Sequence, residues 1–262
     1  MHDVAIIGSG FGGSLLAMIL RRLGKRVLLL EKGTHPRFVI GESSTPIADL
    51  LWLELAERYE LPQLVPFAKW GTWRAHRPEI ACGLKRGFTF YHHRRGERRA
   101  APEPRDCLLV AASPNDQLAD THWYRPEFDA YLAAEAARMG VDYEDLCDVR
   151  DVMFTPGGAR ISVVRDGGEA GRFEARFVVD ATHARGPVPR CLGLPELPVP
   201  HLGETASLFT HFHGVRRTED LGWPPGPGAA GYRPDDAALH HVFDGGWIWV
   251  LRFVNGLTSA GV

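Results

Sequence analysis

The chain has no surplus of charge and no long apolar run. Its formal net charge over 262 residues is -2, so it offers no basic field for nucleic acid or an anionic membrane. No apolar stretch approaches the length of a membrane-spanning helix. The start, MHDVAIIGSG, has neither a basic region nor a small-residue cleavage site, so we expect no nucleic-acid partner, no membrane association and a mature N-terminus.

Several chemistry-bearing patterns are also missing. The chain contains no CxxC, which excludes zinc ribbons and dithiol redox motifs. It has no G-x-S-x-G elbow and no P-loop. His211 and His213 share a strand face, but no carboxylate or cysteine follows at ligand spacing, so we expect no metal site. The cysteines predict free thiols in a cytoplasmic protein, and they are Cys82, Cys107, Cys147 and Cys191.

The first residues predict a strand, a tight turn, a helix and a second strand. Residues 4–7 are a short apolar run typical of a buried parallel strand, and residues 27–30 are another. Between them, G-x-G-x-x-G precedes an apolar helical face that ends at Gly24. Glu31 follows the second strand. A structural glycine turn is the alternative explanation.

The glycines and Glu31 together indicate a nucleotide. Gly8 permits the turn, Gly10 lets a pyrophosphate approach the backbone, and Gly13 lets the helix pack on the strand. The helix start offers free N–H groups to phosphates, and an acid after the second strand binds ribose hydroxyls. The predicted cofactor-binding residues of this segment are Gly8, Ser9, Gly10, Gly12, Gly13, Ser14, Glu31 and Lys32.

A second polar site follows in RFVIGESSTPIADLLWLEL. Thr45 is expected to cap a helix whose first residue is Pro46. A dehydrogenase would instead continue into another βαβ unit. The predicted cofactor-binding residues of this loop are Glu42, Ser43 and Ser44.

The opening unit with GESSTP resembles the flavin monooxygenase superfamily, and within it the flavin-dependent halogenases. The resemblance implies an FAD-binding α/β domain of the glutathione-reductase type, interleaved with a mostly β substrate domain. We assign residues 1–64 and 122–186 to the FAD-binding domain and residues 65–121 and 187–262 to the substrate-side domain. Two proline-rich stretches, residues 186–200 and 222–234, are expected to be irregular, and the second is expected to shape the substrate pocket.

Further residues gain a role through the same resemblance. The family carries R-x-x-F-D on a helix, with the arginine near FAD, and Arg125 matches it; a solvated arginine is the alternative. Residues 161–165 and 172–177 predict strands around a turn, and residues 177–181 predict another short strand. That strand returns to the nucleotide-binding sheet in the family, where Asp180 and Ala181 back the cofactor. His183 replaces the usual glycine, which leaves the local turn geometry open.

Lys69 is the predicted catalytic residue. It lies in VPFAKWGTWRAH among aromatic residues, where desolvation lowers a lysine pKa. Halogenases carry a lysine at about this place that handles hypohalous acid. The alternatives are a surface lysine whose stem packs on Trp70, or a cation–π pair.

The end of the chain resembles the halogenase fingerprint G-x-W-x-W-x-I-P. Alternation puts Trp247 and Trp249 on one strand face, near flavin or substrate by resemblance. Arg252 replaces the proline. A core strand whose tryptophans fill volume is the alternative.

These features predict an FAD-dependent oxidoreductase that halogenates or oxygenates an electron-rich small molecule with reduced FAD and O2. The resemblance implies a flavin reductase as partner. Family members continue past the tryptophan strand with a G-D-A motif, so one alternative is a C-terminally incomplete or partner-dependent flavoprotein that binds FAD weakly and has no turnover alone. Another is a monooxygenase or reductase without halide chemistry.

Overall fold

The computed structural model describes residues 1–97, 101–183, 185–197, 199–223 and 231–262. They form two compact units, each assembled from two segments of the chain. One unit comprises Met1–Phe38 and Arg125–Gly203, and the other comprises Val39–Tyr124 and Glu204–Val262.

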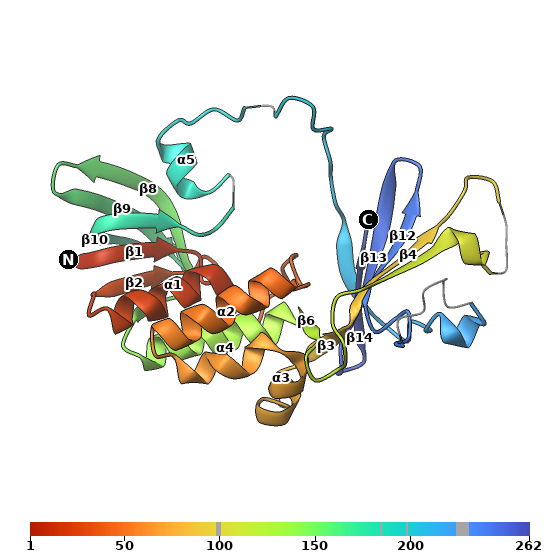
Figure 1. Ribbon diagram of the computed structural model, residues 1–262. Helices are drawn as coiled ribbons and strands as arrows, with labels where there is room; N and C mark the ends of the chain where they lie inside the picture. The colour runs from red at the N-terminus through yellow and green to blue at the C-terminus, as the bar shows by residue number, and fades with distance from the viewer. Residues whose placement is uncertain (98–100, 184, 198, 224–230) are drawn as a thin grey trace. The chain divides into compact units, whose positions relative to one another are not determined.

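The first unit is a six-stranded sheet with helices on both faces (Figure 1). The strand order is β7-β2-β1-β10-β9-β8. The pairs of β7, β2, β1 and β10 are parallel, whereas β8, β9 and β10 pair antiparallel. Its elements are β1 (His2–Ile7), α1 (Phe11–Arg22), β2 (Val27–Leu30), α4 (Arg125–Arg138), β7 (Asp142–Glu144), β8 (Cys147–Thr155), β9 (Gly158–Arg165), β10 (Ala170–Asp180) and α5 (Pro187–Cys191).

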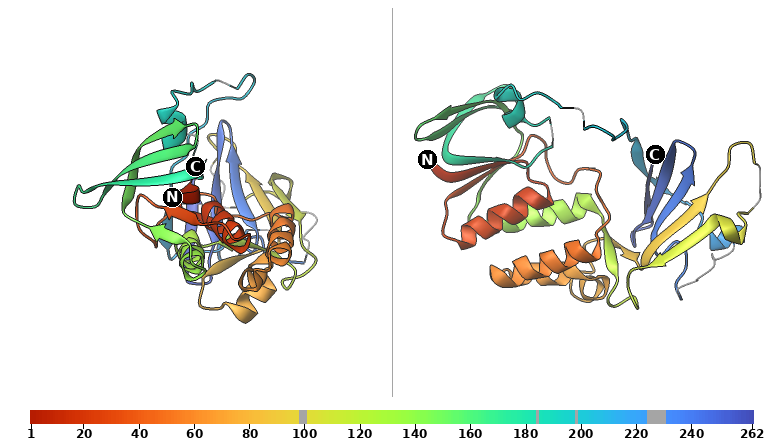
Figure 2. Two further views of the ribbon diagram at one scale, coloured as in Figure 1. Left: turned by 90° about the vertical axis from the view of Figure 1, so that its left-hand side faces the viewer. Right: turned by 45° about the horizontal axis from the view of Figure 1, so that its top comes forward.

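The central strands of this sheet are buried between helices that cover both of its faces. All residues of β2 are buried, as expected of a parallel strand covered on both faces. Ala5 and Ile7 pack in a cluster that Val188 and Cys191 of α5 also touch. Helices α1 and α4 lie side by side on the other face (Figure 2). The predicted strand–turn–helix–strand beginning is confirmed.

One strand replaces two predicted ones. We expected separate strands at 172–177 and 177–181, but β10 runs unbroken over Ala170–Asp180. Its first half pairs with β9 and its second half with β1. The two predicted strands are therefore one, because a strand can change its principal partner along its length without a turn.

The first proline-rich stretch is not wholly irregular. Pro187 begins the short helix α5, because proline is accepted at a first helical position, and the Asp180 carboxylate accepts a hydrogen bond from Val188 N at 2.9 Å. The prediction of an irregular connection there was therefore wrong for Pro187–Cys191. Pro198 of the first stretch and residues 224–230 of the second stretch lie outside the described residues.

The second unit contains a six-stranded sheet of order β11-β14-β13-β12-β4-β5 and the separate pair β3-β6. Among the described strand pairs of the larger sheet, only β12 and β4 are parallel. Its elements are α2 (Pro46–Arg58), η1 (Pro62–Ala68), α3 (Trp70–His76), β3 (Cys82–Lys85), β4 (Gly87–His92), η2 (Pro104–Asp106), β5 (Cys107–Ala111), β6 (Asp120–Trp123), β11 (Phe209–His213), η3 (Glu219–Leu221), β12 (Ala238–Phe243), β13 (Gly246–Arg252) and β14 (Leu257–Gly261).

The two faces of this larger sheet differ. Tyr91, Leu239 and Val250 lie on one face in a buried cluster with Trp223 packed against it. The register places Phe90, His240 and Trp249 side by side on the other face. Strand β14, which we did not predict, extends the sheet beyond the tryptophan strand.

The unit boundaries fall at other residues than the sequence suggested. We placed residues 39–64 with the nucleotide-binding domain, yet they cluster with the second unit. The reason is the packing of α2, which contacts η1 and carries Asp49 into an ion pair with Lys69. Among the helices that the structure describes, none combines the length and apolarity needed to cross a bilayer.

Candidate dinucleotide site and lysine–carboxylate cluster

The turn after β1 requires glycine at two positions. Gly8 has φ 103°, a conformation that side chains other than glycine rarely adopt, and a Cβ there lies 3.0 Å from the Ala181 carbonyl oxygen. A Cβ on Gly13 overlaps the Gly8 carbonyl oxygen, so α1 can approach the turn only without a side chain. A Cβ on Gly12 meets nothing within 4 Å, which leaves this side of the turn open.

Two arginine side chains border Gly10, the N-cap of α1. The first N–H groups of a helix have no intrahelical acceptor, and no side chain caps this helix start. A Cβ placed on Gly10 lies 3.4 Å from Nη2 of Arg125, 3.7 Å from Oδ2 of Asp129 and 3.8 Å from Nη2 of Arg37. Two guanidinium groups and a helix N-terminus therefore lie beside the glycine, with the carboxylate that binds Arg125 among them, and the N–H donors are suited to a phosphate.

Arg125 is held rigidly at the beginning of α4. Its Nε and Nη2 donate to the two carboxylate oxygens of Asp129 at 2.8 and 2.7 Å, and both residues are buried. The guanidinium carbon stands 4.7 Å from the centre of the Phe11 ring. The arginine is thus clamped in the nucleotide-binding unit rather than solvated. Sequence analysis missed Arg37, because no motif marks it.

Glu31 ends β2 as a multiple hydrogen-bond acceptor. Its Oε2 accepts from the backbone N of Ser9 at 3.0 Å and the Ser9 hydroxyl at 2.9 Å, and it pairs with Arg37 at 3.1 Å. Burial acts to raise the pKa of Glu31, but the N–H groups of Ser9 and Gly33 and the charge of Arg37 outweigh it and lower the pKa. The group is therefore a carboxylate, as an acceptor for ribose hydroxyls needs to be.

Three other predicted residues of this unit have mainly structural contacts. Ser14 donates to the Ser9 carbonyl at 3.0 Å. Lys32 is 76% exposed and pairs with Asp148 at 3.4 Å. Asp180 accepts from the Thr182 hydroxyl at 2.6 Å. Ala181 follows β10 and lies beside Gly8. The ends of β1 and β10 are therefore neighbours, as expected.

The GESSTP loop is fixed by the second unit. Thr45 caps α2 by accepting from Ala48 N at 3.3 Å, as predicted. Ser44 N donates to Thr121 O at 3.0 Å, and Ser43 forms an isolated bridge with His122.

Glu42 of this loop binds a histidine far along the chain. Its carboxylate lies 2.8 Å from Nε2 of His211, and both side chains are buried. No motif marks this pair, since the two residues are 169 positions apart.

Lys69 lies between two buried carboxylates. Its Nζ is 3.3 Å from Oδ2 of Asp49 and 3.5 Å from Oδ1 of Asp120. The Lys69 side chain is 28% exposed, whereas each aspartate side chain is 1% exposed. Sequence analysis placed Lys69 among aromatic rings and missed both aspartates, because one lies on α2 and the other on β6.

Lys85 is a second lysine of this cluster, and it is 1% exposed. Its Nζ donates to the Ser44 carbonyl oxygen and stands 4.4 Å from the centre of the Phe88 ring. Burial lowers the pKa of Lys85, and the charges of Asp120 and Asp49 oppose that shift. Sequence analysis missed it. The available signal was a lysine, one of only four, two residues before the aromatic strand GFTFYH.

The two tryptophan side chains of β13 do not lie in the core. Trp247 is 51% exposed, and Trp249 is half-buried against Phe209 at 6.4 Å between ring centres. The register places Trp249 opposite His240, whose ring stacks on Phe90 at 5.1 Å. This is the aromatic face of the larger sheet, and Phe88 beside Lys85 belongs to it.

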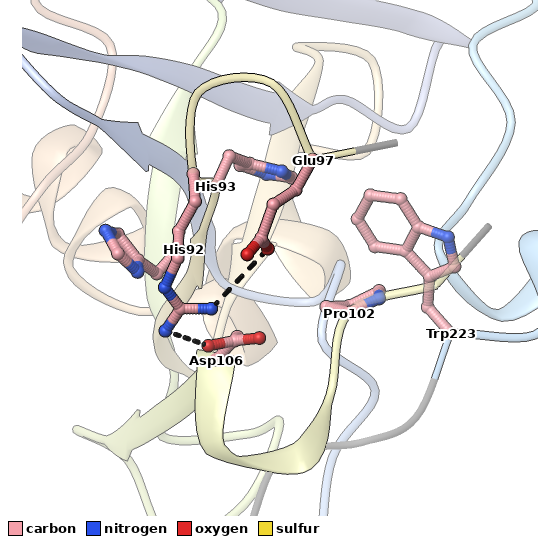
Figure 3. A pocket seen from close by; sticks show the side chains of 7 residues that line it. His92, His93, Glu97, Pro102, Asp106 and Trp223 are labelled. Atoms are coloured by element: carbon pink, nitrogen blue, oxygen red, sulfur yellow. Dashed lines mark hydrogen bonds and ion pairs between the residues drawn. The ribbon is translucent and has the colours of Figure 1, made fainter. Parts of the chain in front are cut away.

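A separate cavity of about 100 Å³ lies at the far end of β4 (Figure 3). Arg94 pairs there with Asp106 at 2.7 Å and with Glu97 at 3.8 Å, so its charge is balanced within the wall. Trp223 and Pro102 close the other side. Within the described residues, no three histidine, cysteine or acidic side chains are placed to hold a metal ion.

Comparison with known proteins agrees with this geometry. The model of the FAD dependent oxidoreductase family matches residues 3–243. The chain is 32% identical over 271 residues to the tetracycline 7-halogenase of Kitasatospora aureofaciens, with 100% of this chain and 46% of the relative covered. It is 54% identical over 218 residues to a 1H-pyrrole-2-carbonyl-peptidyl-carrier-protein brominase of Pseudoalteromonas luteoviolacea, with 82% of this chain and 46% of the relative covered.

A solved structure is similar over nearly the whole chain. The crystal structure of halogenase PltM in complex with phloroglucinol and FAD superposes with a TM-score of 0.86 at 28% identity, over 99% of this chain and 51% of that one. The chain thus spans about half the length of the relatives it matches. It belongs to the FAD-dependent oxidoreductase family, and its relatives in that family are flavin-dependent halogenases.

Proposed function

We propose that this chain is the FAD-binding and lysine-bearing portion of a flavin-dependent halogenase. The observation that carries the proposal is Lys85, a buried amine against the Phe88 ring, in the same chain as a complete dinucleotide turn. Bound FAD would supply, when reduced, the electrons that activate O2 for oxidation of a halide.

The residues of the first unit fit the ADP half of FAD. The N-terminus of α1 with Arg125 and Arg37 would hold the pyrophosphate, because two guanidinium groups already border the space that a Gly10 side chain would occupy. The Glu31 carboxylate would accept hydrogen bonds from ribose hydroxyls. Gly12, on the open side of the turn, leaves room for the ligand.

We further propose that Lys85 handles the hypohalous acid. An amine attacks an electrophilic halogen through its lone pair and therefore only when it is neutral, and burial favours the neutral form of Lys85 by lowering its pKa. Lys69, the residue that the sequence predicted, is held directly by two carboxylates. Lys69 stays the alternative.

An electron-rich small-molecule substrate would lie on the aromatic face of the second unit. Phe90, His240 and Trp249 present stacked or neighbouring rings there, and Trp247 exposes half of its surface. Flat aromatic side chains bind aromatic rings by offset stacking. The tetracycline and pyrrole names of two relatives are compatible with such a substrate.

The test compares two lysine variants of this chain. Reduced FAD, O2 and bromide would be supplied with monochlorodimedone, and halogenated product would be measured by mass spectrometry. We expect Lys85→Met to lose the product and Lys69→Met to retain part of it. Product lost only in Lys69→Met would assign the role to Lys69 instead.

The alternatives give other products. A monooxygenase without halide chemistry would yield an oxygenated product whose amount does not depend on bromide. A partner-dependent flavoprotein would bind FAD weakly and give no product until a partner chain is added.

A flavin reductase is the proposed partner, since the reaction consumes reduced FAD. We propose a cytoplasmic location, because the cysteines of the chain are free thiols. Cell fractionation with an antibody against the chain tests the location, and reconstitution with and without a reductase tests the partner.

A further inference from the structure

Lys69 connects two elements of the second unit. Its Nζ lies 3.3 Å from Oδ2 of Asp49 on α2 and 3.5 Å from Oδ1 of Asp120 on β6. Both aspartate side chains are 1% exposed, and Oδ1 of Asp49 and Oδ2 of Asp120 are buried without a hydrogen-bond partner. Buried carboxylates persist when they are paired, so the Lys69 ammonium supplies the ion pairs that join α2 to β6.

The backbone keeps Lys69 close to β6. The residue follows η1 and precedes α3. The N–H of Trp70 donates to the Ala119 carbonyl oxygen at 2.9 Å, directly before Asp120. The carbonyl oxygen of Lys69 itself accepts from Trp73 N at 2.9 Å. The base of the side chain is therefore fixed, and its nitrogen reaches both carboxylates from there.

Ser44 lies between the two elements that Lys69 joins. It directly precedes Thr45, the cap of α2, and it forms two hydrogen bonds with Thr121 of β6. The Ser44 N–H donates to the Thr121 carbonyl oxygen at 3.0 Å, and the Ser44 hydroxyl oxygen accepts from Thr121 N at 3.1 Å. The position of the Ser44 carbonyl therefore depends on how α2 and β6 are placed.

Lys85 depends on the same elements. Strand β3 pairs antiparallel with β6, and Lys85 is the direct partner of Asp120 in that register. Its Nζ donates to the Ser44 carbonyl oxygen and stands 4.4 Å from the centre of the Phe88 ring. A displacement of β6 or of Ser44 therefore moves the Lys85 nitrogen relative to this ring.

We propose that Lys69 is a positioning residue for Lys85. Its ion pairs with the two aspartates hold α2 against β6. Ser44 then stays in place between these elements, and its carbonyl keeps Nζ of Lys85 over the Phe88 ring. The inference rests on the proposed role of Lys85, and it gives Lys69 a task that needs no contact with halogen or substrate.

The consequence for turnover separates positioning from substrate binding. A displaced amine slows the step that it performs but leaves the aromatic face unchanged, so Lys69→Met should lower kcat about tenfold with little change in KM. Lys69→Arg should recover most of the kcat, because a guanidinium group can pair with both carboxylates. Lys25→Met is the control, since Lys25 is exposed in the first unit. Loss of the product in both Lys69 variants would give Lys69 the chemical role and overturn the proposal.

Nuclear magnetic resonance tests the clamp without FAD or halide. The chain has only four lysines, so lysine labelled with ¹³C at Cε gives few signals, and Lys85→Arg identifies that of Lys85. The ring current of Phe88 should shift the Lys85 Hε protons upfield, and Phe88→Leu should remove the shift. We expect most of this shift to be lost in Lys69→Met and kept in Lys69→Arg and in Lys25→Met.

Asp120→Asn breaks one of the ion pairs with little change in volume, and it should lose the upfield shift as well. An ion pair with a merely structural role would lower the stability in urea and leave the Lys85 signal of the folded protein unchanged. That result overturns the proposal. Circular dichroism of each variant verifies that the fold is intact. Because FAD and halide are absent, the outcome does not depend on whether the chain halogenates.

Discussion

At the scale of single residues, the dinucleotide turn depends on the absence of side chains. Gly13 lies against the Gly8 carbonyl, and Gly10 lies against two guanidinium groups. These constraints could be predicted from the sequence, because G-x-G-x-x-G between two apolar strands specifies a turn in which each glycine has a steric task. The identity of Arg37 as a neighbour could not, since only the folded chain brings it to Gly10.

We predict that Gly13→Ala destabilises the first unit by about 1–3 kcal/mol, because its Cβ overlaps a backbone oxygen that cannot move freely. Urea unfolding would measure the change in the free energy of unfolding. Gly157→Ala is the matched control, since a Cβ there meets nothing within 4 Å. Equal stability of Gly13→Ala and wild type would contradict the described turn.

The second residue-scale prediction concerns pH. The pKa of Asp49 is raised from 3.8 to about 7, so the folded protein binds this proton more tightly than the unfolded chain does. The resulting stabilisation is complete below pH 3.8 and declines as the pH rises to about 7. Asp49→Asn should flatten the fall of stability over this range. Urea titrations at several pH values measure it, and an unchanged slope would refute the raised pKa.

At the scale of elements, helix α4 presents Arg125 to the turn through a bidentate pair with Asp129. The R-x-x-F-D pattern was sufficient to find this helix and its arginine. The limits of pattern reading show elsewhere. Strand β10 changes partner without a turn, and α5 begins at a proline in a stretch that otherwise resembles a linker. In both cases, tertiary contacts decide between equally permitted local structures.

We predict that Arg125→Lys weakens FAD binding about tenfold, because a lysine cannot make the two parallel bonds to Asp129 and so loses its fixed position. Flavin fluorescence titration would measure the dissociation constant. Arg138 lies exposed at the other end of the same helix, so the control variant Arg138→Lys should bind FAD as the wild type does. Similar affinities of the two variants would remove Arg125 from the site.

At the scale of the whole molecule, the interleaving of two units could be predicted, but the place of each segment could not. Helix α2 follows the dinucleotide segment in sequence, yet it belongs to the second unit, where its Asp49 pairs with Lys69. Lys85 was not predicted for a similar reason, because its neighbours come from distant parts of the sequence. A lysine near an aromatic strand is unremarkable in sequence. Only the folded chain brings β6, the Phe88 ring and the Ser44 carbonyl to Lys85.

Equilibrium binding of FAD to this chain, with ADP as competitor, tests whether the dinucleotide turn holds the cofactor. We expect saturable quenching of flavin fluorescence that ADP reverses. Gly10→Val should abolish the quenching by filling the space beside Arg125 and Arg37, and Gly157→Ala should preserve it. Flavin binding that ADP leaves unchanged, or that Gly10→Val retains at full strength, would contradict this prediction.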